Sequence, residues 1–186
     1  MRSLEENPWK ITSKKDVYET PWITVTHHDV VNPAGNQGIY GTVHFKNYAL
    51  GIVALDENND TWIVGQYRFP MNEYTWEIPE GGGPVGEDPL ISAKRELMEE
   101  TGIEASDWLL IQHMQLSNSA SDEVAFLYLA KNLIYHKPHP EENEELQQRK
   151  IHFETLYAMV KAGKVTDSLT VAAVLKIKLM MLEGEL

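Results

Sequence analysis

Residues 81–103 read GGGPVGEDPLISAKRELMEETGI and carry most of the functional information in this chain of 186 residues. Asp88 can cap the start of a helix, Pro89 suits its first position, and Gly102 offers the left-handed residue that commonly ends one. The pattern predicts a helix of about thirteen residues. One face of it is apolar and packs, and the adjacent arc carries glutamates that we expect to face away from the packed side.

Three of these glutamates, Glu96, Glu99 and Glu100, offer oxygen ligands at i, i+3 and i+4. Because the chain has no cysteine to favour a softer metal, the set favours Mg²⁺, with Mn²⁺ possible. Arg95 lies one turn before Glu99 and can pair with it. Such ions act beside phosphate oxygens, so the helix indicates metal-assisted phosphoryl chemistry. The alternative is a solvated, salt-bridged surface helix.

The chain resembles the Nudix hydrolases, which cleave a nucleoside diphosphate linked to another moiety. It matches their whole signature, namely Gly81, Glu87, Arg95, Glu96, Leu97, Glu99, Glu100, Gly102 and Ile103. The resemblance implies that Glu96 and Glu100 are the principal metal ligands. Glu99 would be a further ligand or an outer carboxylate, and the carbonyl of Glu80 another ligand. Arg95 and Glu87 would be orienting residues of the catalytic site.

Three further segments resemble the branch of ADP-ribose and nucleoside diphosphate sugar pyrophosphatases: QYR at 66–68, WEIPEG at 76–81 and DSLTVAA at 167–173. In that branch the residues that match Arg68 and Glu77 face the substrate. Arg68 could hold a phosphate through a forked pair of hydrogen bonds. A surface arginine at a strand end is the alternative.

The acidic segment EENEE at 141–145 precedes a predicted strand. Its position resembles the mobile loop that supplies the catalytic carboxylate in ADP-ribose pyrophosphatases. The resemblance implies that Glu142 is the general base and that Glu144 binds a third metal ion. A solvated loop is the alternative interpretation of such a charge run.

The substrate expected from the resemblance is a nucleoside diphosphate sugar, split into a nucleoside monophosphate and a sugar phosphate. ADP-ribose-specific members usually carry a proline downstream of the signature, where this chain has LSNSASDE at 116–123. Both ADP-ribose and GDP-mannose types therefore stay open. Tyr18 and Trp22 could stack on the base, although aromatic residues are more often core. A nucleoside triphosphate pyrophosphatase and a non-catalytic nucleotide-sugar-sensing scaffold are the alternatives.

Composition narrows the class of partner. A net charge of −12 argues against a nucleic-acid polymer or an anionic membrane, because affinity for phosphate groups comes from Lys and Arg. The N-terminal residues contain no apolar stretch typical of a signal peptide, and no apolar run is long enough to span a membrane. A cytoplasmic enzyme is therefore expected.

The order of apolar segments predicts the α+β class. We expect one β-hairpin over 23–31 and 39–45 and a second over 50–55 and 61–67. Later strands are expected at 124–130 and 146–153, and helices at 154–162 and 168–182.

The arrangement implied is a Nudix-type α/β/α sandwich, in which a mixed sheet lies between helices. Residues 1–45 would form an N-terminal β subdomain and residues 46–186 the Nudix hydrolase domain. In the related pyrophosphatases the N-terminal subdomain crosses to a second subunit. A homodimer with a shared substrate site is therefore expected, since an isolated hairpin is unstable.

Overall fold

The structure is a computed structural model that describes residues 5–137 and 146–186. It divides into two compact units. The first contains the residues up to Asn47 together with Gln115–Glu123, and the second contains Tyr48–Met114 and Val124–Leu186. No helix among the described residues is long and apolar enough to cross a membrane.

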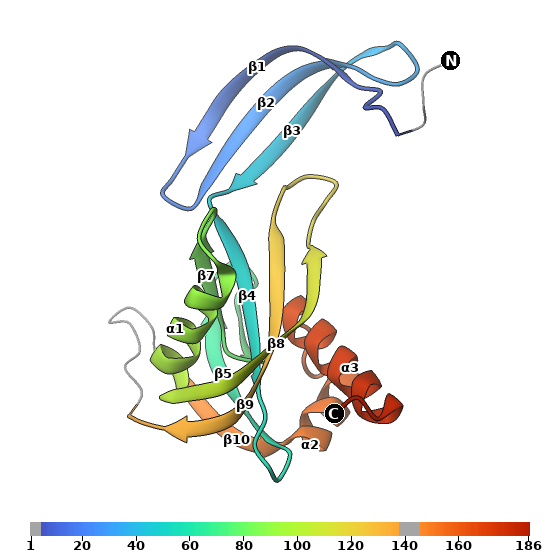
Figure 1. Cartoon of the computed structure of the whole chain (residues 1–186). Coiled ribbons are helices and arrows are strands. Elements are labelled where there is room, and N and C mark those ends of the chain that lie inside the picture. Colours follow the sequence, from blue (N-terminus) through green and yellow to red (C-terminus); the bar gives the residue numbers. More distant parts are fainter. Residues whose placement is uncertain (1–4, 138–145) are drawn as a thin grey trace. The chain divides into compact units, whose positions relative to one another are not determined.

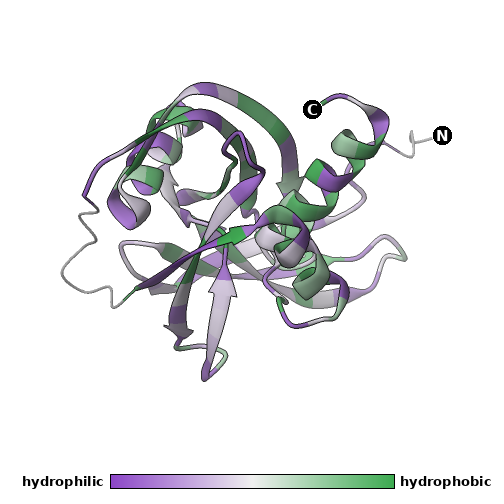
Figure 2. Cartoon of the chain, turned by 90° about the horizontal axis from the view of Figure 1, so that it is seen from below, coloured by the Kyte–Doolittle hydropathy of each residue, from purple (hydrophilic) through white to green (hydrophobic). Residues whose placement is uncertain are grey.

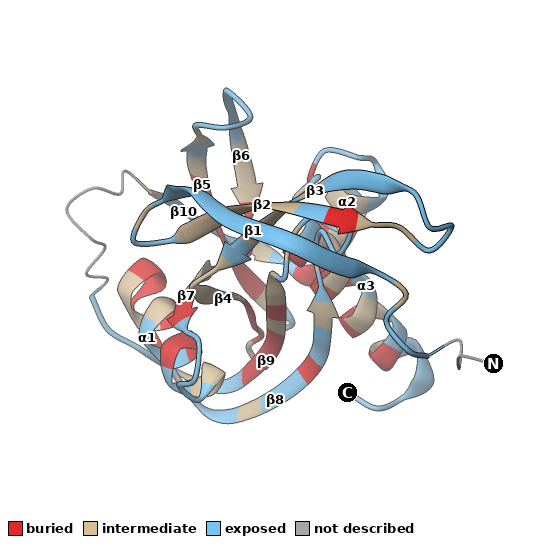
Figure 3. Cartoon of the chain, turned by 90° about the horizontal axis from the view of Figure 1, so that it is seen from above, coloured by how far each residue is buried: buried red, intermediate tan, exposed pale blue. Residues whose placement is uncertain are grey.

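The first unit is built on a three-stranded antiparallel sheet, in the order β1 (Lys10–Glu19), β2 (Ile23–Val31) and β3 (Gln37–Phe45). The predicted hairpin is confirmed as β2 and β3. Strand β1 was not predicted, because its sequence KITSKKDVYE is mostly polar, and every residue of it is exposed (Figure 3). The segment 115–123 joins this sheet through β3, where the amide of Val43 donates to the carbonyl of Ala120 at 2.8 Å.

The second unit has the expected α+β architecture. Figure 1 shows α1 on one side of its strands and α2 and α3 on the other. The four-stranded sheet has the order β7-β4-β9-β8, with β4 and β9 parallel, and a three-stranded antiparallel sheet has the order β10-β5-β6. The strands are β4 (Asn47–Ala54), β5 (Asp60–Arg68), β6 (Glu73–Glu77), β7 (Glu80–Pro84), β8 (Ile103–Gln115), β9 (Val124–Tyr135) and β10 (Gln147–His152), and the helices are α1 (Pro89–Thr101), α2 (Phe153–Lys161) and α3 (Ser168–Glu183).

The second predicted hairpin is wrong. Strands β4 and β5 share only the isolated bridge between Leu55 and Thr61, and they belong to different sheets. The chain does reverse between them, since the Asp56 side chain accepts hydrogen bonds from the amides of Asn58 and Asp60. Each strand has five consecutive buried residues, so both suit a central position with partners from elsewhere in the chain.

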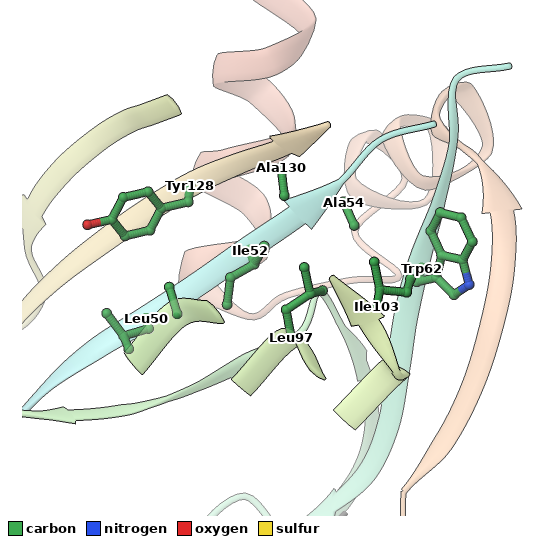
Figure 4. Close-up of a cluster of buried hydrophobic side chains, with 9 residues drawn as sticks. Leu50, Ile52, Ala54, Trp62, Leu97, Ile103, Tyr128 and Ala130 are labelled. Carbon is green, nitrogen blue, oxygen red and sulfur yellow. The ribbon is translucent and has the colours of Figure 1, made fainter. Parts of the chain in front are cut away.

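Hydrophobic side chains of β4 pack against α1. In Figure 4 the side chains of Leu50 and Ile52 lie with Leu97 of α1 in a cluster of buried residues. Helix α3 is hydrophobic over most of its length (Figure 2) and buries residues in each of its turns. Since both helices are anchored, the segments that precede them are held in place.

Candidate active site

Helix α1 begins and ends where the sequence predicts. The side chain of Asp88 accepts a hydrogen bond from the amide of Leu90 at 3.0 Å, and Pro89 is the first helical residue. Gly102 has the left-handed φ of 69° and donates its amide to the carbonyl of Met98. The prediction of this helix is therefore confirmed at both ends.

The glycines before α1 let the backbone lie directly on the helix. A Cβ atom on Gly81 would overlap the carboxylate of Glu96, and one on Gly83 would lie 2.7 Å from the Ser92 hydroxyl. The amide of Gly82 donates to Oε1 of Glu96 at 3.2 Å. The carboxylate of Glu87 accepts a hydrogen bond of 2.7 Å from the Ser92 hydroxyl, the group that lies against Gly83.

Glu100 lies where the sequence analysis did not expect it. It was expected to face away from the packed side, but it is only 2% exposed. Its Oε2 accepts a hydrogen bond from the amide of Glu80 at 3.0 Å, so the carboxylate lies against the start of β7. Glu96 and Glu100 thus hold the amides of two residues on either side of Gly81.

Arg95 lies between two carboxylates of the same helix. Its Nη1 donates to Glu99 at 2.6 Å, the pair that the i, i+4 spacing predicts, and its Nη2 donates to Glu96 at 2.7 Å. Nη2 also donates to the carbonyl of Gly82 at 3.0 Å. Burial raises the pKa of Glu96, and the neighbouring charge of Arg95 opposes that rise.

The residues around Gly81 fit a hard divalent cation. The side-chain donors are carboxylate oxygens, and the glycine brings backbone atoms close to them. The position of the Arg95 guanidinium indicates that Glu96 and Glu99 accept a cationic group between them. Within the described residues, however, no three His, Asp or Glu side chains converge on one point, so α1 by itself provides a partial set of ligands.

Arg68 and Glu77 are brought together on neighbouring strands. Nε of Arg68 lies 3.0 Å from both carboxylate oxygens of Glu77, and Nη2 also donates to Glu77. Glu77 is 2% exposed and accepts a further hydrogen bond from Thr75. Glu77 therefore occupies Nε and Nη2 of the guanidinium, and Nη2 also lies 3.6 Å from Oε2 of Glu80.

The side chain of Glu80 is buried beside Asp167, which caps α3. Burial raises the pKa of Glu80 well above its ordinary value, and the hydrogen bond and negative charge of Asp167 add to the rise. Burial also raises the pKa of Asp167, but hydrogen bonds from Glu80 and from the amide of Thr170 outweigh it and the net shift is downward. The charge of Arg68, whose Nη2 lies 3.6 Å from Oε2 of Glu80, opposes the rise in the pKa of Glu80.

Four predicted site residues remain. Tyr18 and Trp22 belong to the first unit, where both are exposed. Glu142 and Glu144 lie outside the described residues.

Sequence reasoning missed the roles of several buried partners. No contact of Asp167 or Thr170 with the segment that precedes the signature was predicted, yet both side chains contact it. Gln148 was not considered, and its side chain donates to the carbonyl of Glu100. The Asp-x-x-Thr spacing of a helix cap was a usable signal for the first pair, whereas nothing local marks Gln148.

Comparison with protein families identifies two matches. Residues 46–171 match the NUDIX domain. Residues 9–43 match the family described as the nucleoside diphosphate sugar hydrolase N-terminal domain.

The alignments with individual relatives cover different fractions of the chain. An ADP-ribose pyrophosphatase of Bacillus subtilis is 29% identical over 176 residues, which is 94% of this chain and 93% of that protein. The ADP-ribose pyrophosphatase of Mycobacterium tuberculosis is 41% identical over 46% of this chain and 42% of its own length. The methanol dehydrogenase activator of Bacillus methanolicus is 34% identical over 68% of this chain and 69% of its own length.

Among solved structures, one described as an ADP compounds hydrolase has the same fold. Its TM-score is 0.85 at 20% identity, and the alignment covers 100% of this chain and 98% of that chain.

Proposed function

Because the chain belongs to the Nudix hydrolase family, whose domain covers residues 46–171, we propose that it hydrolyses the diphosphate bond of a nucleoside diphosphate sugar. The substrate is of the ADP-ribose or GDP-mannose type. The products are a nucleoside monophosphate and a sugar phosphate.

One observation carries the proposal. Glu96 and Glu100 lie against the same turn, and each accepts an amide hydrogen bond from it, on either side of Gly81. This arrangement fixes two carboxylates and the backbone around Glu80 relative to each other. A site for divalent ions beside a diphosphate needs such a fixed group of oxygens.

Each residue at this site has its own proposed role. Glu96, Glu100 and the carbonyl of Glu80 would hold Mg²⁺, or Mn²⁺ in its place, with Glu99 as a further ligand and Arg95 orienting the carboxylates. The ions would neutralise phosphate charge and activate water when they are bound. From residues outside the described part of the chain, Glu142 would accept the proton of the attacking water and Glu144 would add a ligand.

Two features favour a nucleotide sugar as the substrate. Residues 9–43 match the N-terminal domain of nucleoside diphosphate sugar hydrolases, and the full-length relative in Bacillus subtilis is named as an ADP-ribose pyrophosphatase. Glu77 fixes the orientation of Arg68, so Nη1 of its guanidinium could donate to a phosphate without a further loss of side-chain freedom.

The first unit supports a homodimer. It exposes large apolar side chains, namely Ile11, Val17, Tyr18, Trp22 and Ile39. Exposed apolar side chains that gather on one unit are typical of a surface that binds another protein. We infer that a second copy of the chain covers it and that Tyr18 and Trp22 contact the base of the substrate there.

The test is a substrate panel with identification of products. Purified protein with Mg²⁺ is incubated with ADP-ribose, GDP-mannose, UDP-glucose and nucleoside triphosphates. Turnover of at least one nucleotide sugar above all triphosphates is expected. Preferred release of pyrophosphate from a triphosphate would overturn the assignment of substrate, and absence of turnover on the whole panel would overturn the proposal of an active hydrolase.

A further inference from the structure

One buried hydroxyl connects the last helix of the chain to the turn before the signature. Thr170 lies in the first turn of α3 and is fully buried. Its Oγ1 accepts a hydrogen bond from the amide of Ile78 at 3.0 Å and donates to Oε1 of Glu80 at 3.1 Å. Since these two residues flank Pro79, a single hydroxyl holds both ends of the segment 78–80.

The position of this hydroxyl is itself determined. The amide of Thr170 donates to Oδ2 of Asp167 at 2.7 Å, which is the N-cap interaction of α3. The side chain of Asp167 is also hydrogen-bonded to Glu80. The cap fixes the backbone of Thr170, and the hydrogen bonds of Oγ1 with Ile78 and Glu80 select the orientation of its side chain.

The opposite side of the same segment contacts the proposed metal ligands. The amide of Glu80 donates to Glu100 at 3.0 Å, and the carbonyl of Pro79 accepts from the amide of Ile52 in β4 at 2.9 Å. The segment 78–80 is therefore held between α3, α1 and β4. A shift of this segment would move the backbone of Glu80 relative to the carboxylate of Glu100.

We propose that Thr170 is a positioning residue of the metal site: its hydroxyl holds the segment 78–80 at the distance from α1 that the bound ions require. This inference rests on the proposed function, because it concerns the same site. Thr170 contacts neither substrate nor ion in this account and acts through Ile78 and Glu80. The competing explanation is that the hydroxyl only satisfies a buried amide and contributes to stability alone.

The test compares metal binding by two variants of Thr170 in the intact chain without substrate. Thr170→Val replaces the hydroxyl with a methyl group of similar size and leaves the Ile78 amide without its partner. Its Mn²⁺ affinity, measured by electron paramagnetic resonance of the free ion, should fall by about 10- to 100-fold, as for other outer partners of metal ligands. Thr170→Ser keeps the hydroxyl and should bind Mn²⁺ like the wild type.

Thr61→Val provides a matched control. Thr61 is also fully buried, but its Oγ1 has no hydrogen-bond partner within the described residues. Thr61→Val makes the same chemical change at a buried position without removing a hydrogen bond, and it should leave Mn²⁺ affinity unchanged. Circular dichroism at the temperature of the binding experiment establishes that each variant is folded. If Thr170→Val does not fold, Thr170→Ala takes its place with the same expected loss.

The outcomes separate this inference from the proposed function. Wild-type affinity in the folded Thr170→Val variant, or equal losses in Thr170→Ser and Thr170→Val, would overturn the positioning role. If the wild type binds Mn²⁺ and Glu100→Gln does not, the metal site would stand even though the positioning role had failed. A wild-type chain that binds no Mn²⁺ would overturn both.

Discussion

Glu100 is a buried carboxylate that we propose to bind the metal ion, so its charge would have a function beyond packing. Its Oε2 already accepts the amide of Glu80, and a glutamine at this position would still offer an oxygen acceptor. Glu100→Gln should therefore keep the fold. We expect kcat to fall by more than about 100-fold, because even outer partners of metal ligands contribute 10- to 100-fold. Steady-state rates over a range of Mg²⁺ concentrations, with thermal unfolding of the same samples, check this.

A second glutamate provides the control for Glu100. Glu104 lies just beyond the helix on β8, and its side chain is 57% exposed. Glu104→Gln makes the same chemical change at the surface and should leave both kcat and the Mg²⁺ requirement unaltered. Full activity of Glu100→Gln at limiting Mg²⁺ would remove Glu100 from the set of ligands.

The close contact of the glycine turn with α1 leads to a prediction about Gly81. A Cβ atom there would overlap the Glu96 carboxylate, so Gly81→Ala must displace either the turn or that side chain. We expect a loss of activity of at least about 10-fold together with weaker metal binding, the effect of disturbing a ligand's surroundings. Gly38→Ala, on β3, has no atom within 4 Å of the added Cβ and should behave as wild type. Wild-type kinetics in Gly81→Ala would mean that the turn and α1 are not closely fitted.

The attachment of segment 115–123 to β3 should depend on pH. The carboxylate of Asp122 accepts hydrogen bonds from the amide of Phe45 at 2.9 Å and from His44 at 2.6 Å. Burial raises the pKa of Asp122, but these hydrogen bonds outweigh it, so the net pKa lies below its ordinary value of 3.8. Because the pKa of Asp122 is lower in the folded state, its contribution to stability is complete above the pKa of the unfolded state. That contribution is lost as the pH falls through the pKa of the folded state.

Hydrogen exchange of the Phe45 amide measures this attachment. Its protection factor should stay constant down to about pH 4, the region of the unfolded-state pKa of aspartate, and decrease below it. The variant Asp122→Ala should show the low protection at every pH. Loss of protection well above about pH 4 would contradict the assignment to Asp122.

Local signals in the sequence predicted the elements with strong caps and failed for those set by distant contacts. Asp88, Pro89 and Gly102 give the bounds of α1 directly. The neighbours of β4, which are β7 and β9, could not be predicted, because a buried apolar strand does not specify its neighbours and β9 comes after α1 and β8. Strand β1 was missed because polar residues alternate along it without a buried face.

The candidate site shows the same division. Its signature residues were identified from the resemblance to the Nudix hydrolases, and spacing alone predicted the pairing of Arg95 with Glu99, which the structure shows. The burial of Glu100 could not be predicted, because the turn that covers it is non-helical and lies outside the periodicity of α1. The contacts of Thr170 depend on the packing of α3, which is 90 residues away from Glu80 in sequence.

The chain as a whole is proposed to act as a homodimer with a shared substrate site. Light scattering of the active enzyme should give twice the 21.2 kDa mass of one chain. If Trp22 of one copy completes the site of the other, mixed dimers of Glu100→Gln and Trp22→Ala chains contain one intact site. Co-expression of the two variants should therefore restore activity that neither has alone. A fully active monomer, or failure of the mixed dimers to regain activity, would contradict the shared site.

The identity of the bond that is broken tests the central claim most directly. Phosphorus NMR of the preferred nucleotide sugar, incubated with the wild-type protein and Mg²⁺, follows both phosphates at once. We expect the diphosphate signals to disappear and the signals of a nucleoside monophosphate and a sugar phosphate to replace them. When a chelator replaces Mg²⁺, the diphosphate signals should stay as they are. Release of an intact nucleoside diphosphate and a free sugar, or cleavage that persists with the chelator, would contradict it.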